Sequence, residues 1–490
     1  MNLEYAGLFH ALRPEISLVV GALLILGLDL SVFRRRSPVE RLQRARGLGL
    51  LAVAAAGWHV IQAGPLGAVW GGGLMFDALA VATRLGVLTL ALLTVGILSE
   101  RRSLRHPAEH VAVVLIATTG FLLMAAAHQL LLAFLALELA SLSLYVLAGF
   151  DKTRRESAEA ALKYFLFGGM AAAFLLFGFS LIYGLTGSIE LPRIAAVLAT
   201  QGLSPLLAVA LVMVLVAFGF KAAAAPFHLW APDVYEGAPT SSAALIASAS
   251  KLAGFTLFYR LLWPGLGAAA GSVSALDGPP GWLWAVAAVS AASMLIGNFA
   301  ALAQTNLRRL LAYSAIAHAG ALLLGVMAAG SAGAAPFFYY AVTYGLATVG
   351  AFGVIAVMEG DGPCEKITDL AGLSRRSPLL AGCLAVFVLS LAGIPPLAGF
   401  FGKFIVFAAA LQLGGLNGPA GWLAMLAIGL SAVALYYYLI VLKQALVVAP
   451  AVGAGRIHVP VVAKLSLLVA AALIVGLGLA PSRVLELFAR

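Results

Sequence analysis

Long apolar runs, separated by short polar stretches, make up almost the whole chain. A helix needs about 20 apolar residues to cross the hydrocarbon core of a bilayer, and a window of that length finds about fourteen such runs. Prolines interrupt the seventh run at Pro226 and the twelfth at Pro395 and Pro396. Because proline removes a backbone donor and clashes with the preceding turn, these two helices should be broken. The predicted spans are 16–33, 46–63, 77–98, 110–127, 129–149, 159–184, 205–230, 240–263, 282–303, 308–328, 335–358, 378–411, 421–447 and 460–480.

The composition is that of a polytopic membrane protein, since 62% of the 490 residues are hydrophobic and only 10% are charged. A soluble chain of this length could not bury so much apolar surface. The sequence therefore predicts an all-α fold that crosses the membrane many times.

The net charge of +10 does not indicate nucleic-acid binding, because the basic residues are confined to short loops between the apolar runs. Loops rich in lysine and arginine stay on the cytoplasmic side of a membrane. All the rich loops fall on one side, so both termini are predicted to face outward. The basic loop residues are Arg34, Arg35, Arg36, Arg41, Arg44, Arg46, Arg101, Arg102, Arg105, Lys152, Arg154, Arg155, Arg308, Arg309, Lys366, Arg375 and Arg376.

The chain shows no sequence motif for a bound cofactor. Its two cysteines, Cys364 and Cys383, lack the spacing of a metal site, which argues against an iron–sulfur cluster or a haem clip. Neither a GxGxxG turn after a strand nor a P-loop is present, so no nucleotide site is predicted.

The stretch from Lys221 to Lys251 combines a lysine, the break at Pro226, a histidine and a polar turn, and then re-enters an apolar helix. Ionisable groups at membrane depth beside a broken helix mark an ion path by default. This stretch is therefore predicted to handle protons.

Several ionisable residues lie inside the apolar runs. Glu138 sits in the middle of the fifth run, where a lone carboxylate needs a cationic partner or a proton, and Lys163 and Lys221 are the candidate partners. Burial disfavours the charged form of a lysine and a nearby carboxylate favours it, so such a pair can load and release a proton. The alternatives are a purely structural ion pair for Glu138 and snorkelling to the membrane surface for Lys163.

Lys251 and Lys403 are likewise bounded by apolar residues on both sides. His228 follows the break and either relays protons or caps the broken helix. His318 either links two half-paths or makes an interhelical hydrogen bond. Other polar residues have simpler explanations: snorkelling or structural pairing for Lys443 and Arg84, helix ends for Asp29 and Asp77, and core packing or a membrane-interface position for Tyr436, Tyr437 and Tyr438.

The chain also resembles itself. LLAFLALELASLSLYVLAG from Leu131 is similar to LLAYSAIAHAGALLLGVMAAG from Leu310, and each is followed at a similar distance by a proline-broken helix bearing a lysine, Lys221 or Lys403. Five helices fit in this period, and an odd number of spans inverts the second copy in the membrane.

The run KAAAAPFHLWAPDVYEGAPTSSAALIASASKLAGF closely resembles the signature of the antiporter-like subunits of respiratory complex I. Within that family, VYEGAP and ALKYFLFGGMAAAFLLFGFSLIYGLTGS at 161–188 are similar to the N-type subunits of bacterial NADH-quinone oxidoreductase. LSLAGIPPLAGFFGKF at 389–404 resembles the second broken helix of the family. The resemblance covers about residues 75 to 480.

The resemblance implies fourteen helices with two inverted five-helix repeats, helices four to eight and nine to thirteen. It divides the chain into helices one to three at 1–109, a first repeat at 110–263, a second repeat at 282–449, and a last helix with the C-terminus at 460–490. The residues that match the family's functional positions are Glu138, Lys163, Lys221, His228, Lys251 and Lys403.

The resemblance also implies proton translocation across the inner membrane of a bacterium, driven by quinone reduction elsewhere in a translocating NADH:quinone oxidoreductase. NADH, FMN, iron–sulfur clusters and quinone would be bound by other subunits. The partners would be the M-, K-, J- and L-type subunits of the membrane arm, with lipid around them.

Two other functions compete with this one. A subunit of a multi-subunit Na⁺/H⁺ antiporter would share the fold and use the same lysines. A membrane scaffold without transport would have no need for several buried charges, each of them costly in lipid.

Overall fold

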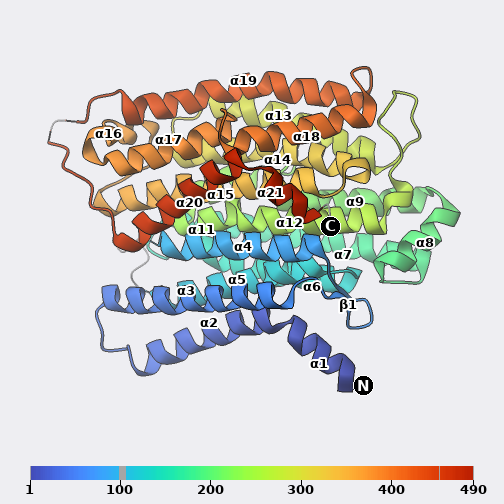
Figure 1. Cartoon of the computed structure of the whole chain (residues 1–490), viewed down its shortest axis with the longest axis horizontal. Helices are drawn as coiled ribbons and strands as arrows, with labels where there is room; N and C mark the ends of the chain where they lie inside the picture. Colours follow the sequence, from blue (N-terminus) through green and yellow to red (C-terminus); the bar gives the residue numbers. More distant parts are fainter. Residues whose placement is uncertain (1, 99–105, 452, 489–490) are drawn as a thin grey trace.

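The computed structural model describes residues 2–98, 106–451 and 453–488, so the predicted basic loop residues Arg101, Arg102 and Arg105 lie outside the described residues. Most helices lie side by side along one direction and form an elongated bundle (Figure 1). The chain is thus an all-α polytopic membrane protein, as the composition predicts.

Within the described ranges, seventeen helical segments build the bundle. They are α2 (Arg13–Ser31), α3 (Pro38–Ala63), α4 (Ala78–Gly96), α5 (Pro107–Ala126), α6 (Leu130–Ala148), α7 (Arg155–Thr186), α9 (Pro205–Ala222), α10 (Trp230–Gly237), α11 (Thr240–Ala247), α12 (Ala249–Arg260), α13 (Trp282–Leu302), α14 (Leu307–Ala332), α15 (Ala335–Asp361), α17 (Pro378–Ala392), α18 (Ala398–Gly414), α19 (Pro419–Leu446) and α20 (Val461–Leu479).

Shorter elements lie at the ends of the bundle. They are α1 (Asn2–Ala11), the antiparallel strands β1 (Gly67–Val69) and β2 (Leu74–Phe76), α8 (Leu191–Gln201), α16 (Leu373–Arg376), α21 (Ser482–Leu485) and single turns at Leu261–Gly265, Gly267–Ala269, Ile367–Leu370 and Glu486–Phe488. The pattern of apolar runs had predicted none of them, because each is too short to cross a membrane.

In the described part of the chain, 12 segments are long and apolar enough to span a membrane, counting α11 and α12 together as one. The short apolar helices α17 and α18 form the two halves of one more span. The α3 helix is the fourteenth span. Its 26 residues are long enough to cross a membrane, although its first turns carry charges. The structure therefore agrees with the predicted number of helices.

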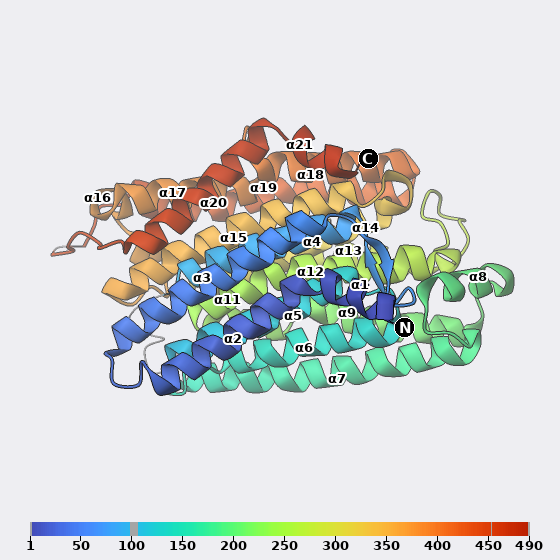
Figure 2. The same ribbon diagram turned by 60° about the horizontal axis from the view of Figure 1, so that its bottom comes forward.

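Those predicted basic loops that the structure describes lie at one end of the bundle, which we call the basic end (Figure 1). There the backbone of Asn306 pairs with that of Lys366, and Arg154 lies 3.4 Å from Glu365. The β1–β2 hairpin and α8 lie at the opposite end (Figure 1). Turned by 60°, the bundle shows α6 and α7 packed together along one edge (Figure 2).

The seventh span breaks where its proline predicts. The α9 helix ends at Ala222, Ala223 takes a left-handed conformation with φ 56°, and α10 begins at Trp230. Groups outside α9 satisfy the freed backbone: Ser293 Oγ accepts the Ala225 amide at 2.8 Å, and the Trp230 indole donates to the Phe220 carbonyl at 3.1 Å. Irregular backbone at membrane depth is tolerated only when it is buried in protein in this way.

The twelfth span breaks between α17 and α18, at Gly393, which has φ 88°. Ser390 Oγ accepts the amide of Gly399 across this break at 3.1 Å. A third break was not predicted: α11 ends at Ala247 and α12 begins at Ala249, with Ser248 between them at φ −119° and ψ −82°. The Ser248 hydroxyl donates to the Ala244 carbonyl at 2.6 Å, and such back-bonding bends helices.

Candidate functional site

Lys221 lies at the end of α9, where it is 5% exposed and faces α6. Its ammonium donates to the Ser141 hydroxyl at 3.2 Å rather than to Glu138. Glu138 lies one helical turn earlier on α6, and one of its carboxylate oxygens is buried without a hydrogen-bond partner among the described residues. Lys221 and Glu138 thus lie near each other, as predicted, but the Lys221 ammonium is hydrogen-bonded to Ser141.

Lys251 is the next buried ammonium and is carried by α12, three residues after the unpredicted break. It donates to the Ala315 carbonyl of α14 at 2.5 Å and lies 5.5 Å from the centre of the Tyr344 ring. A cavity of about 10 Å³ separates it from Lys221. That volume is at the lower limit for one water molecule. The other lining residues are Phe218, Ala222, Gly254, Phe255 and Phe258.

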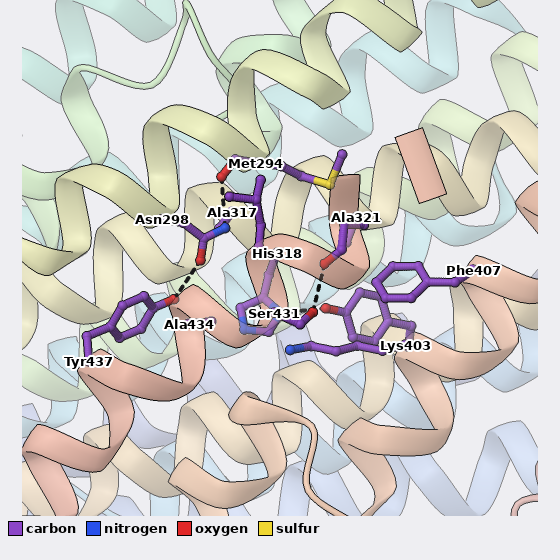
Figure 3. A pocket seen from close by; sticks show the side chains of 13 residues that line it. Met294, Asn298, Ala317, His318, Ala321, Lys403, Phe407, Ser431, Ala434 and Tyr437 are labelled. Carbon is purple, nitrogen blue, oxygen red and sulfur yellow. Dashed lines mark hydrogen bonds between the residues drawn. The ribbon is translucent and has the colours of Figure 1, made fainter. Parts of the chain in front are cut away.

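Lys403 lies beyond the second proline break, on α18. It donates to the carbonyl of Ala392, the last residue of α17, at 3.0 Å. A cation at this position is favoured by the partial negative charge of a helix C-terminus. Lys403 also lines a cavity of about 30 Å³, which has room for about two waters, together with His318, Asn298 and Tyr437 (Figure 3).

His228 lies within the break between α9 and α10, where it is 8% exposed. Its Nδ1 is buried and makes no hydrogen bond within the described part of the chain. The ring does have a backbone partner within the break, at Pro226, so the capping role and the relay role both stay open.

Lys163 belongs to a different group of charges, nearer the basic end of α7. It pairs with Glu159 at 2.7 Å and with Asp233 of α10 at 2.6 Å, and its side chain is 38% exposed. Arg309 of α14 binds Asp233 and Glu236, each at 2.8 Å. Lys163 is therefore not the partner of Glu138. The role of Arg309 in this cluster was not predicted, because the sequence indicated only a basic residue in a loop.

Two ion pairs near the opposite end tie α4 to its neighbours α2 and α12, and the pair with α2 is buried. Arg84 of α4 lies 2.6 Å from Glu15 of α2, and Arg260 of α12 lies 2.5 Å from Asp77. In the loop between α5 and α6, burial lowers the pKa of His128, and the nearby Arg260 guanidinium adds to this effect. These contacts confirm structural pairing for Arg84, and Asp77 also caps α4 through the Ala80 amide.

Among the other polar residues, Asp29 differs from its predicted role, whereas the tyrosines and Lys443 agree with theirs. Asp29 is buried and bonded to Arg41, so it is not a solvated helix end. Tyr437 is buried and its hydroxyl donates to Asn298 at 3.2 Å, whereas Tyr436 is 62% exposed on the surface of the bundle. Lys443 is exposed near the end of α19, as snorkelling predicts.

The chain is similar to known proteins along nearly its whole length. Residues 127–435 match the family model described as NADH:quinone oxidoreductase/Mrp antiporter, transmembrane. The chain is 49% identical over 491 residues to NADH-quinone oxidoreductase subunit N 2 of Acidobacterium capsulatum, with 98% of both chains covered. The chain belongs to the N-subunit family of NADH-quinone oxidoreductases. Subunit N 1 of Roseiflexus castenholzii, another member, is 38% identical over 96% of this chain and 95% of its own.

Two solved structures have the same fold as this N-family chain. A chain of respiratory complex I from Thermus thermophilus is 36% identical, with a TM-score of 0.78 over 96% of this chain and 98% of its own. A chain of the Mrp complex from Dietzia has a TM-score of 0.79 over 99% of this chain and 96% of its own, at 22% identity. At that identity the likeness to the Mrp chain concerns the fold alone.

Proposed function

We propose that this chain translocates protons in the membrane arm of NADH-quinone oxidoreductase, driven by quinone reduction in other subunits. The observation that supports this most strongly is the set of three buried ammonium groups on Lys221, Lys251 and Lys403. Each donates to a neutral oxygen, and none is paired with a carboxylate within the described residues. Burial disfavours the charged form of such a group, so each is prepared to pass its proton on.

In this proposal, Glu138 and Lys221 form the switchable pair. Movement of the Glu138 carboxylate towards Lys221 favours the protonated lysine, and its withdrawal releases the proton. Lys251 and His228 carry the proton between the half-channels, and Lys403 receives it beside the second break. Lys163 acts near the basic end, where its bond to Asp233 holds α10 in place.

The proposal extends to the orientation of the chain in the membrane, its repeats and its neighbouring subunits. The basic end would face the bacterial cytoplasm and both termini the periplasm, in the inner membrane. The inverted repeats would occupy 110–263 and 282–449, preceded by 1–109 and followed by 460–490. The M-, K-, J- and L-type subunits would be neighbours, and NADH, FMN, iron–sulfur clusters and quinone would be bound elsewhere in the complex.

The experiment that tests the function uses bacterial membranes that carry the whole complex with Lys221→Ala. Proton pumping and NADH-quinone reductase activity are measured together, and a native gel establishes assembly. Lys464→Ala is the matched control, because Lys464 is an exposed lysine on α20. We expect the Lys221 variant to assemble and to lose pumping and coupled turnover, while the control keeps both.

Unchanged pumping in an assembled Lys221→Ala complex would overturn the proposal. The Na⁺/H⁺ antiporter alternative makes a different prediction. It requires sodium-dependent proton exchange in membranes in which the chain occurs without any NADH-oxidising complex, and exchange under those conditions would favour it.

A further inference from the structure

The connection between α2 and α3, at the basic end, carries a dense group of arginines. Six arginines and two acidic residues lie in the stretch 29–46. The amide of Arg36 donates to the Phe33 carbonyl at 2.9 Å, which closes a tight turn between the two helices. Arg34 and Arg35 are the two residues at the tip of this turn, and both are exposed.

Three of the six arginines are engaged within the chain itself. Arg41 donates to Asp29 from Nε at 2.8 Å and from a second nitrogen to the other carboxylate oxygen. Arg36 lies 3.9 Å from Glu40, one helical turn away. Arg46 is buried in the bundle. The two acidic residues of the stretch are therefore both used, and they leave the other three arginines without a counter-charge.

The remaining three, Arg34, Arg35 and Arg44, are exposed and have no acidic partner among the described residues. The Arg44 guanidinium lies 4.6 Å from the centre of the Phe33 ring, so a cation–π contact holds it beside the turn. Arg309, at the same end of the bundle, differs from them because it binds two carboxylates. We call Arg34, Arg35 and Arg44 the arginine triplet.

Exposed apolar side chains lie directly next to the arginine triplet. Leu30, near the end of α2, is 71% exposed, Val32 is 61% exposed, and Leu23 and Leu24 continue this apolar face further back along α2. With 19 residues, α2 is about 28 Å long, close to the thickness of about 30 Å of a bilayer's hydrocarbon core. The end of α2 therefore lies at the edge of the hydrocarbon, and the turn lies in the layer of lipid headgroups.

The helices on either side of the triplet form one margin of the bundle. The α2 and α3 helices pack against each other and against α4 and α5, and nothing in the chain covers their outer faces (Figure 1). On α3 the outer face carries Leu51 and Trp58, which are 68% and 61% exposed. Such a margin presents apolar surface to acyl chains and unpaired positive charge to headgroups, which is the pattern that an anionic phospholipid fits.

We propose that the arginine triplet binds the phosphate of an anionic phospholipid whose acyl chains lie along Leu30 and Val32. A guanidinium is always charged and can bind two phosphate oxygens at once. A zwitterionic lipid carries its own ammonium group beside the phosphate, so the site prefers a lipid with net negative charge. The lipid site is independent of the proposed function, because none of its residues takes part in proton transfer.

The test places a photoreactive benzophenone amino acid at position 30 of the whole complex, in nanodiscs of equal amounts of phosphatidylglycerol and phosphatidylethanolamine. Mass spectrometry then identifies the lipid that is cross-linked to the chain. Each arginine near an anionic membrane surface strengthens binding about fivefold, and salt screens part of this. We therefore expect about 10-fold more phosphatidylglycerol than phosphatidylethanolamine in the cross-links. The same probe at Leu479, which is 70% exposed at the opposite end of the bundle, should follow the bulk composition.

Two triple variants separate the site from the overall charge of the basic end. Arg34→Gln, Arg35→Gln and Arg44→Gln together should reduce the preference for phosphatidylglycerol to less than about twofold. The matched control changes three other exposed basic residues of the same end, Lys152, Arg155 and Arg375, to glutamine. This control removes the same charge and should keep the preference. A native gel establishes that each complex assembles.

Three results would overturn the lipid site: cross-links at position 30 that follow the bulk lipid composition, equal preferences in the two triple variants, or cross-links to another protein subunit. The last result would show that this margin is covered by protein. If the variant without the arginine triplet does not assemble, the salt dependence of the unaltered arginines decides. The preference for phosphatidylglycerol should then fall steeply between low and high salt, and a preference that salt does not change would also overturn the site.

Discussion

The contact between Lys221 and Ser141 allows a quantitative test, because Ser141 supplies the hydrogen-bond acceptor observed for this ammonium. Ser141→Ala removes one oxygen and adds no volume. A hydrogen bond to a charged group contributes about 1.5–3 kcal/mol. The adjoining cavity of about 10 Å³ can admit at most about one water as a substitute acceptor, so we take the lower half of that range.

A loss of about 1.5–2 kcal/mol disfavours protonated Lys221 by a factor of about 10 to 30. Because protonated Lys221 loses its hydrogen-bond acceptor, this lysine gives up its proton at a lower pH than before. Pumping that requires protonated Lys221 should then lose its alkaline limb about one pH unit earlier. The assay is the pH profile of proton pumping and NADH-quinone reductase activity in assembled complex.

Ser143→Ala is the control for this experiment. Ser143 lies two residues further along α6, and its hydroxyl donates to the Leu139 carbonyl of the same helix at 2.8 Å, not to a charged group. Its pH profile should match that of the wild type. A Ser141→Ala profile that coincides with that of Ser143→Ala would refute the reasoning.

Two further predictions concern packing and stability. Glu15→Gln leaves the guanidinium of Arg84, which is 2% exposed, without its carboxylate and should destabilise the protein by about 3–5 kcal/mol, whereas the double variant with Arg84→Gln should recover part of the loss; heating followed by a native gel measures both. Gly399→Ala would place a methyl 1.9 Å from the Ser390 carbonyl oxygen, so it should cost about 1–3 kcal/mol and reduce pumping, while Gly429→Ala, which meets nothing within 4 Å, should change neither assembly nor pumping.

The number of helices and two of the three breaks could be predicted from the sequence, because span length and proline act locally. The third break lies at Ser248, without a proline or glycine. The only local feature at this break is the serine-rich run before Lys251, and the apolar pattern around that run predicts a continuous helix. Serine back-bonding to the preceding turn is compatible with an intact helix as well as with a bend, so the surrounding packing decides.

The buried lysines were predicted from their cost in lipid, but their partners were not. Lys163 meets Asp233, which lies 70 positions later in the chain, and only the folded bundle brings them together. Lys221 binds Ser141 instead of Glu138, although these two α6 residues are a single turn apart. Periodicity cannot decide between two side chains on one helix face, because the choice depends on where α9 ends.

The phenylalanine-lined gap between Lys221 and Lys251 has a consequence for energy conservation. A pump with an unbroken hydrogen-bonded path between the two faces of its membrane would short-circuit the gradient that it builds. Here Phe218, Phe255 and Phe258 surround a space for at most about one water. If protons pass between these lysines as proposed, entry of a single water would complete the link and its exit would interrupt it, which would limit proton leak between turnovers.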